Sequence, residues 1–346
     1  MTDAAPEPAP HRRRPRYSGK NPRRFEEKYK ERDPQRYAET VAKVLASGKT
    51  PAGSHRPIMV AEILEVLAPK PGEIAVDATL GYGGHAQEIL PRLQPGGRLL
   101  GLDVDPIELP KTTARLRALG FDDATFTAHR GNFAGLSRVL ADAGLAGADC
   151  IVADLGISSM QLDDPARGFS FKIDGPLDLR LNPNRGQPAS AFLEKVKPEQ
   201  LAALLSENAD EPHSAILARA LTGHVLPTTR ALAAAIRSAL ANVREDEREV
   251  SVRRVFQALR IAVNDEFGAL DTFLRNLGVC LNPGGRVAIL TFHSGEDRRV
   301  KKAFEAAHAA GIFAEISREV VRATPAERRA NPRSTSAKLR WARRAL

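Results

Sequence analysis

The sequence has little cysteine, few aromatic residues and no long hydrophobic run. Its two cysteines, Cys150 and Cys280, lie in apolar segments, which predicts buried, reduced thiols rather than a disulfide. Cysteines and histidines nowhere have the spacing of a metal site, so we expect no metal. The N-terminus lacks an apolar signal core, and no apolar stretch approaches the ~20 residues of a membrane span. We therefore expect a cytoplasmic protein that does not enter a membrane.

Negative charge is scarce at the two ends of the chain, although the net charge of the whole is only +9. Residues 1–56 carry 14 Lys/Arg against 7 Asp/Glu, and residues 318–346 carry 9 against 2. The middle, 57–317, holds 28 against 33 and is mildly acidic. Basic tails around an acidic middle fit a polyanion partner such as RNA, but a contribution to solubility alone would explain them equally well.

The most informative stretch is residues 74–86, which read I-A-V-D-A-T-L-G-Y-G-G-H-A. A short β-type run ends at Asp77, a turn with glycines at positions 81, 83 and 84 follows, and a helix-like segment begins at Ala86. Glycine lets the backbone approach a ligand closely, and a helix N-terminus offers free N–H groups. The combination indicates the opening of a nucleotide-binding βαβ unit.

Strand-like and helix-like segments alternate after this turn, which predicts an α/β fold with a mostly parallel sheet. More than 125 residues separate the fourth and fifth expected strands, although a crossover between parallel strands needs only one helix. The helix-like sequence between them therefore predicts an inserted helical domain. The expected strands are 74–76, 98–103, 124–128, 149–155 and 286–292, with final strands at 312–321 and 338–342.

Three parts follow from this pattern. Residues 1–54, rich in proline and arginine, should form a basic and largely disordered extension. Residues 55–165 and 252–346 should form the sheet domain, and residues 166–251 the helical insert. Apolar spacing predicts a helix over 252–277 that breaks or bends near Asn264–Gly268.

Two ligands fit the glycine turn equally well. The turn has the pattern G-x-G-x-x-A of a dinucleotide-binding site. Asp103 follows 20 residues beyond Gly83, where such a site has an acid that binds a ribose hydroxyl. S-adenosylmethionine also carries a ribose and fits the same parts, and a turn without a ligand is the third alternative. Asp77 favours the sulfonium-bearing ligand, because a carboxylate just before the turn would repel a pyrophosphate.

Asp154 ends the fourth expected strand, on the crevice side of such a sheet. Methyltransferases that act on exocyclic amines place a hydrogen-bond acceptor there, because the lone pair of such an amine is conjugated into its ring. Accepting its N–H hydrogens weakens that conjugation and aims the nitrogen at the methyl group. The alternative is that Asp154 only caps the next segment.

The chain resembles the ribosomal RNA small subunit methyltransferase H family, whose members methylate N4 of a cytidine in 16S rRNA. The similarity runs from about His55 to the C-terminus and leaves 1–54 outside it. Met160 and Gly295 depart from the family pattern next to functional blocks but leave the polar residues of those blocks in place. The run Asn208-Ala-Asp-Glu211 also departs from it, on the surface of the insert and not in the cofactor site. The matching blocks are His55–Val60, Asp77–His85, Leu102–Pro106, Asp154–Asp164, Arg167–Phe171, Asp174–Arg180, Arg254–Arg260, Phe292–Arg298 and Asn331–Ser334.

The resemblance implies a Rossmann-like class I methyltransferase sheet with an inserted all-helical domain, and S-adenosylmethionine as the cofactor. Asp103 suits the ribose hydroxyls, Phe133 suits a face of adenine, and His85 could reach the methionine carboxylate or simply cap the turn. The partner is then 16S rRNA within the small ribosomal subunit, and a homodimer is possible. The cofactor contacts it implies are Gly83, Gly84, His85, Asp103, Phe133, Asp154 and Gln161.

For catalysis we expect direct methyl transfer, with Asp154 orienting the amine. Ser158 and His293, in crevice loops, could complete the hydrogen bonding or accept the released proton; His293 could equally bond a neighbouring loop. Phe169 and Phe171 could stack on a splayed base, or pack the insert onto the core. Asp178 and Arg180, the other residues expected on the substrate side, could form an ion pair that shapes this loop.

Three other classes of function remain compatible with the residues. One is an RNA-binding assembly factor on a methyltransferase fold, whose catalysis is dispensable. Another is an NAD-dependent oxidoreductase. The third is an amino-methyltransferase that acts on DNA or protein, because basic tails suit RNA and DNA equally.

Overall fold

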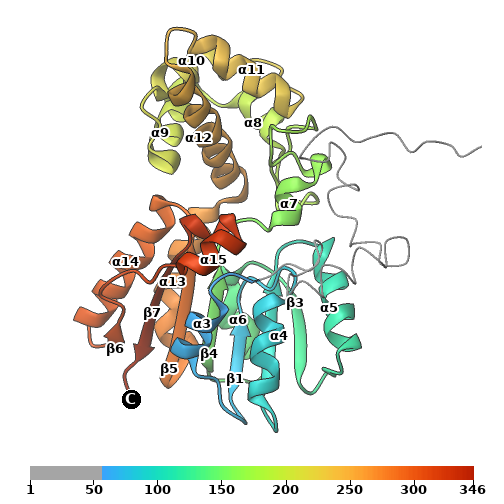
Figure 1. The fold of residues 1–346 in the computed structure, drawn as a ribbon, viewed down its shortest axis with the longest axis vertical. Coiled ribbons are helices and arrows are strands. Elements are labelled where there is room, and N and C mark those ends of the chain that lie inside the picture. Colours follow the sequence, from blue (N-terminus) through green and yellow to red (C-terminus); the bar gives the residue numbers. More distant parts are fainter. Residues whose placement is uncertain (1–56) are drawn as a thin grey trace, which may run out of the picture. The chain divides into compact units, whose positions relative to one another are not determined.

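The computed structural model describes residues 57–346, so the extension expected over 1–54 lies outside the described residues. Within 57–346 the strands form one seven-stranded sheet of order β3-β2-β1-β4-β5-β7-β6 (Figure 1). The first five strands are parallel, and β7 is antiparallel to both β5 and β6. The strands are β1 (Ile74–Asp77), β2 (Arg98–Asp103), β3 (Phe126–Arg130), β4 (Ala148–Asp154), β5 (Leu281–Thr291), β6 (Phe313–Ile316) and β7 (Lys338–Arg344).

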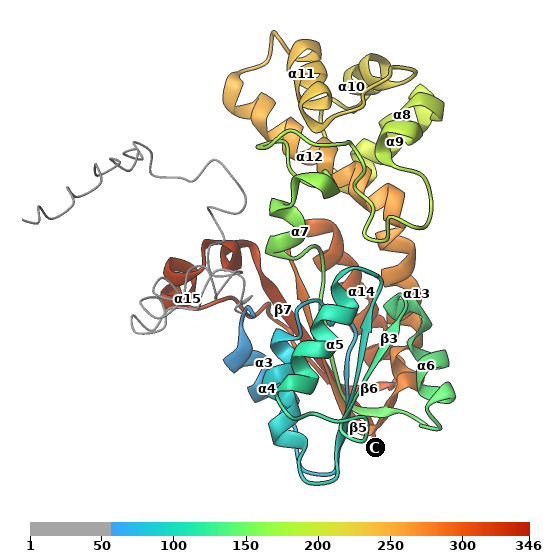
Figure 2. The ribbon, with the colours of Figure 1, turned by 90° about the vertical axis from the view of Figure 1, so that its right-hand side faces the viewer.

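Helices cover both faces of the sheet (Figure 2). Because successive side chains of a strand point to opposite faces, Leu99 packs in one apolar cluster and its neighbour Leu100 in the other. The cluster with Leu99 includes α3 (Val60–Leu67), α4 (Gly84–Ile89) and α5 (Glu108–Ala118), and the other includes α6 (Leu136–Asp142), α13 (Glu266–Cys280) and α14 (Ser294–Ala309). These features confirm the predicted Rossmann-like sheet.

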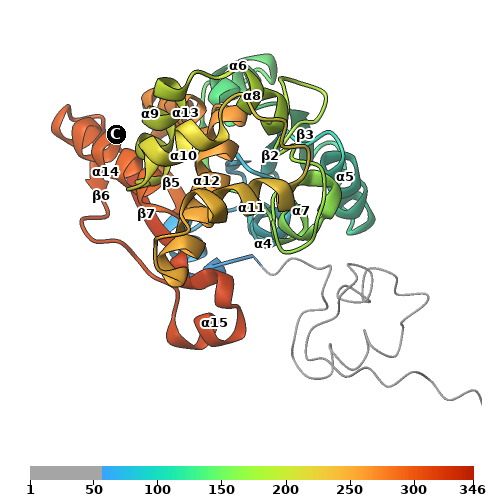
Figure 3. The ribbon, with the colours of Figure 1, turned by 90° about the horizontal axis from the view of Figure 1, so that it is seen from above.

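The segment between β4 and β5 is helical, as predicted, and it has a hydrophobic core of its own (Figure 3). Leu205 of α9, Leu232 of α11 and Leu259 of α12 are completely buried in that core. The division at residue 251 stays a prediction, and α12 runs across it without interruption. The helices of the segment are α7 (Ser159–Asp163), α8 (Ala189–Lys195), α9 (Pro198–Ala209), α10 (Ser214–Leu221), α11 (Thr229–Ala239) and α12 (Glu245–Asn264).

The predicted break in the long helix is confirmed. The helix α12 ends at Asn264, Asp265 adopts a left-handed conformation with φ 49°, and α13 begins at Glu266. A left-handed residue cannot continue an α-helix, so the chain turns at this point. The bend directs the chain from the insert back to the sheet.

Several predicted elements differ from the structure. The fifth strand, expected over 286–292, is β5 and begins five residues earlier, at Leu281. The third strand begins two residues later, at Phe126, because Asp122 caps a turn by accepting the N–H of Thr125. The strand expected over 312–321 is limited to β6, and only an isolated bridge from Val321 to Leu339 continues it. The basic loop before β7 contains a short helix, α15 (Pro325–Ala330), and a 3₁₀ turn.

Candidate active site

A cavity of about 380 Å³ lies where the carboxyl ends of β1, β2, β4 and β5 meet the helical segment. Its wall contains most of the residues that the sequence assigns to catalysis and cofactor binding. They are Gly84, His85, Asp103, Phe133, Asp154, Ser158, Gln161 and His293. The expected residues that do not line it are Gly83, Phe169, Phe171, Asp178 and Arg180.

The glycine turn depends on backbone conformations that other residues rarely adopt. Gly81 and Gly83 have φ of 47° and 71°, and Gly83 precedes the first residue of α4. A Cβ atom on Gly83 would lie only 2.9 Å from the side chain of Thr112, in α5. Gly83 therefore sets the shape of the turn and its packing on α5, while Gly84 lies in the cavity wall.

Asp103 ties the glycine turn to the end of β2. One carboxylate oxygen accepts the N–H of Gly81 at 2.7 Å, and the other accepts the N–H of Asp105 at 2.8 Å. Burial raises the pKa of Asp103 to about 6, although both N–H groups oppose this shift. Each oxygen has a second lone pair, so the carboxylate can still accept two hydroxyl hydrogens from a ligand.

A buried acid–histidine cluster lies beside the turn. His85 Nε2 is 3.4 Å from an oxygen of Asp154, and Nε2 is buried without a hydrogen-bond partner among the described residues. Burial would lower the pKa of His85, but Asp154 and Asp77 outweigh it and raise the pKa. Burial likewise raises the pKa of Asp77 to about 6. The Asp154 backbone N–H donates to Thr79 Oγ1 at 2.6 Å, which fixes this end of β4.

Phe133 lies in the cavity wall, in the short turn that follows β3. Its ring packs against Phe273 of α13 with centroids 5.3 Å apart. The side chain of Asn132 caps the turn by accepting the N–H of Ala134 at 2.9 Å. Packing against Phe273 and the cap on its turn therefore fix the position of the Phe133 ring.

Ser158 and Gln161 form a capping box at the start of α7. Ser158 Oγ accepts the N–H of Gln161 at 3.1 Å, and Gln161 Oε1 accepts the N–H of Ser158 at 2.9 Å. The amide nitrogen of Gln161 then donates to Asp105 at 2.8 Å. Both side chains thus have structural partners as well as a place in the cavity wall.

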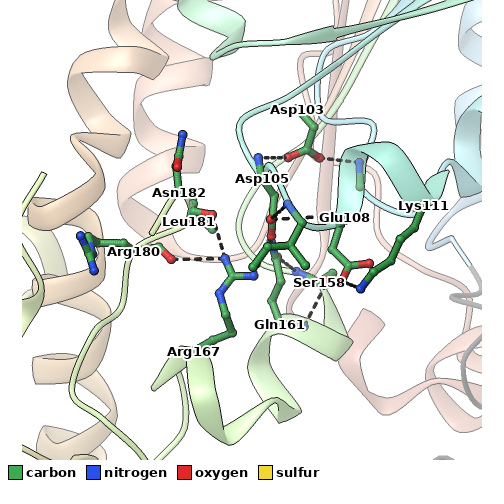
Figure 4. Close-up of polar contacts among 12 residues, drawn as sticks. Asp103, Asp105, Glu108, Lys111, Ser158, Gln161, Arg167, Arg180, Leu181 and Asn182 are labelled. Atoms are coloured by element: carbon green, nitrogen blue, oxygen red, sulfur yellow. Dashed lines mark hydrogen bonds and ion pairs between the residues drawn. The ribbon is translucent and has the colours of Figure 1, made fainter. Parts of the chain in front are cut away.

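Asp105 is completely buried and joins the sheet domain to the loop after α7 (Figure 4). One of its oxygens accepts N–H groups at the start of α5, and the other accepts from Gln161 and from Arg167 Nη1, the latter at 2.8 Å. Arg167 also donates to the carbonyl of Leu181 at 2.7 Å. Leu181 lines the cavity, so this network connects the end of β2 to another part of the wall.

His293 caps α14 by accepting the N–H of Glu296 on Nδ1 at 3.4 Å. This bond lies within the helix that His293 caps, so it differs from the bond to a neighbouring loop that the sequence leaves open. Nε2 is 3.2 Å from a Glu296 oxygen and is buried without a hydrogen bond of proper geometry. Burial would raise the pKa of Glu296, but His293 and Arg260 outweigh it and lower the pKa.

The expected substrate residues lie within the helical segment. Phe169 is only 5% exposed, and Phe171 packs against Phe256 with ring centroids 5.3 Å apart. Both rings pack in the core of the helical segment itself rather than between the insert and the sheet domain, and stacking on a base stays a prediction. Asp178 and Arg180 do form the expected ion pair, with two contacts of 2.7 Å.

Sequence analysis missed the part of the wall that the α12–α13 bend provides. Asn264, Glu266 and Phe267 come from the bend itself, and Arg260 comes from the last turns of α12. Arg260 ends one of the blocks that carry the family resemblance, and the predicted helix break lies just beyond it. A charged residue on each side of a predicted break, close to the end of a matching block, was the available signal.

Other kinds of site find no support within residues 57–346. No group of His, Cys, Asp and Glu in this range could hold a metal ion. None of its helices is long and apolar enough to cross a membrane.

The sheet order, the glycine turn and the acids that end β2 and β4 define a Rossmann-like methyltransferase that uses S-adenosylmethionine. The MraW methylase family model matches residues 52–345, and the chain belongs to this family. The donor set fits that cofactor: Asp103 has lone pairs left for ribose hydroxyls, Phe133 offers a ring face, and His85 has a buried nitrogen without a partner.

Relatives match almost the whole chain. Ribosomal RNA small subunit methyltransferase H 1 of Lachnoclostridium phytofermentans is 50% identical over 341 residues, covering 96% of this chain and 93% of the relative. Methyltransferase H 2 of Alkaliphilus metalliredigens is 50% identical over 339 residues, covering 95% and 97%. Methyltransferase H of Halorhodospira halophila is 42% identical over 321 residues, covering 87% and 97%. The family model begins at residue 52, in agreement with a similarity that starts near His55, whereas the alignment with the first of these relatives also includes part of 1–54.

Removing Arg167 should destabilise the protein strongly. In Arg167→Met the carboxylate of Asp105 stays buried without its charged partner, which typically costs about 3–5 kcal/mol. Urea unfolding of the purified variants measures this cost. Arg180→Met is the matched control, because its ion pair with Asp178 is more exposed, and it should cost about 1 kcal/mol. A loss below 1 kcal/mol for Arg167→Met would contradict the assigned role of the pair.

Proposed function

We propose that this protein transfers the methyl group of S-adenosylmethionine to N4 of a cytidine in 16S rRNA of the small ribosomal subunit. Membership of the MraW methylase family and relatives named as ribosomal RNA small subunit methyltransferases support an rRNA substrate. The observation that carries the choice of an amine is Asp154. This acceptor ends β4 in the wall of the same cavity as Asp103 and the glycine turn.

On the cofactor side, each residue has a role suited to its contacts. Asp103 accepts hydrogen bonds from ribose hydroxyls with its remaining lone pairs, and Phe133 packs on adenine. Gly84 and His85 hold the methionine end, where the unpartnered Nε2 of His85 can bond a carboxylate. Gly83 and Gln161 act indirectly, Gly83 through the shape of the turn and Gln161 through Asp105.

On the substrate side, Asp154 accepts an N–H of the target amine and turns the nitrogen lone pair out of conjugation. The cofactor supplies an electrophilic methyl group on a sulfonium, so the chain needs no covalent nucleophile. Ser158 and His293 are in the same cavity wall and are our candidates for completing the hydrogen bonds of the amine. Because Nδ1 of neutral His293 accepts the N–H of Glu296, Nε2 carries the ring proton and acts as a donor, so the proton that the amine loses goes to Asp154, which already accepts its N–H.

Residues 166–251 are the proposed substrate-recognition domain, with Phe169 and Phe171 as aromatic candidates. The ion pair of Asp178 and Arg180 keeps its proposed role in shaping the loop. A cytoplasmic location fits the proposed substrate, and a homodimer stays a prediction.

Replacing Asp154 tests the proposal directly. Asp154→Ala should lower methyl transfer to small subunits from a strain lacking this enzyme by at least ~100-fold, because the amine loses its acceptor. Labelled S-adenosylmethionine and nucleoside mass analysis of the digested RNA measure the product. Circular dichroism and thermal unfolding check that the variant is folded. Near-wild-type formation of N4-methylcytidine by the folded variant would refute the role of Asp154, and absence of that product with the wild-type enzyme would refute the function.

Affinity for S-adenosylmethionine should fall as the pH drops through about 6, the value to which burial raises the pKa of Asp103. Only the ionised carboxylate accepts from both ribose hydroxyls, so affinity should decrease about tenfold per unit below that pH. A carboxyl whose folded-state pKa is raised stabilises the folded state as the pH falls, so acid unfolding through this group does not explain the loss. Calorimetric titration between pH 5 and 7.5 measures the effect. Asp103→Asn should bind weakly with little dependence on pH, and an equally steep dependence in that variant would contradict the assignment.

A further inference from the structure

The α12–α13 bend holds a charged pair in the wall of the cavity. Arg260 donates from Nε and Nη2 to the two oxygens of Glu266 at 2.8 and 2.9 Å. The side chains are only 12% and 14% exposed. Both residues line the cavity that contains Asp154, and the proposed function assigns them no role.

The bend creates this pair. Residues six positions apart on a straight α-helix lie about 240° apart around its axis and do not face each other. The left-handed conformation of Asp265 bends the chain and brings Glu266 next to Arg260. The pair is therefore a product of the tertiary structure rather than of helix spacing.

Most of the donors of Arg260 have no partner in the protein. A guanidinium has five N–H groups, and two of them bond Glu266. Within residues 57–346, Arg260 donates no other hydrogen bond. Because Arg260 lines the cavity, the remaining three N–H groups can donate to the acceptors of a ligand bound there.

A second pair in the same chain shows what a purely structural arginine looks like. Arg286, at the opposite end of the sheet, bonds both oxygens of Glu73, and the two side chains are 12% and 18% exposed. It also donates to the carbonyls of Leu67, Ala68 and Asp149, so five hydrogen bonds use all five donors. Burial is similar in the two pairs, but only Arg260 has donors left, and only its pair lines the cavity.

We infer that Arg260, oriented by Glu266, is a specificity-determining residue that binds O2 and N3 of the target cytosine. This inference rests on the proposed function. Cytosine presents O2 and N3 as neighbouring acceptors in one plane, which suits the planar fork of a guanidinium. The N4 amine continues the same edge and needs an acceptor, which Asp154 supplies in the same cavity. Uracil has N3–H in place of the N3 acceptor, so its N3–H would face an N–H donor of Arg260.

The test compares Arg260→Gln with Arg286→Gln as the matched control. Enzyme in excess methylates small subunits in a single turnover, below the unfolding temperature of every variant, and calorimetry measures binding of S-adenosylhomocysteine. Arg260→Gln should react about 100-fold more slowly while its affinity for S-adenosylhomocysteine stays within threefold of wild type. Arg286→Gln should lose thermal stability but react within threefold of the wild-type rate.

A base analogue separates recognition from a structural effect. Small subunits are reconstituted with 16S rRNA that carries 3-deazacytidine at the methylated position, which keeps the amine and replaces N3 by C–H. Replacing cytidine by this analogue should slow the wild-type enzyme about tenfold more than it slows Arg260→Gln. The reason is that only the wild-type enzyme has the bond from Arg260 to N3 to lose. Any change in amine reactivity affects both enzymes equally and cancels in the comparison.

Three results would overturn the inference: a wild-type rate for Arg260→Gln, equal sensitivity of both enzymes to the analogue, or loss of S-adenosylhomocysteine binding in Arg260→Gln. Failure of the proposed function itself would look different, because the wild-type enzyme would then form no N4-methylcytidine on natural subunits.

Discussion

The buried carboxylate of Asp105 is the constraint on which the site depends. A charge removed from water is tolerated only when it is paired and hydrogen-bonded, and Asp105 meets this requirement with partners from three segments of the chain. Its backbone N–H also holds Asp103, whose other oxygen holds the glycine turn. The two acids, two residues apart, therefore set the positions of the turn, the loop after β4 and the segment at Leu181 together.

The residues of the cavity wall come from two parts of the fold. The parallel strands provide the glycine turn, Asp103 and Asp154, as expected where the carboxyl ends of such strands meet. The bend between α12 and α13 provides Arg260 and Glu266. One wall thus belongs to a scaffold shared by many nucleotide-binding proteins, and the other to the segment between β4 and β5. A division of this kind lets the second wall differ among enzymes while cofactor binding is preserved.

Local patterns in the sequence predicted the sheet, the glycine turn, the helical insert and the helix break, because each has a short-range signature. The family resemblance added the site residues, and the structure brings eight of them to one cavity. Local patterns did not place Phe169 and Phe171, because burial of an aromatic ring depends on helices far away in the chain. They also missed the pairing of Arg260 with Glu266, which exists only because the chain bends at Asp265. The short polar helix α15 lacked the apolar periodicity that prediction needs.

The insertion between β4 and β5 bears on how the chain folds. These strands are neighbours in the middle of the sheet, yet the whole helical segment separates them, so their pairing must close a very long loop. Loop-closure entropy grows with the length of flexible chain, and contacts distant in sequence form slowly. The separate hydrophobic core of the helical segment offers a remedy. If that core assembles first, the loop becomes a compact body with close ends, and the two halves of the sheet can join as though the insertion were short.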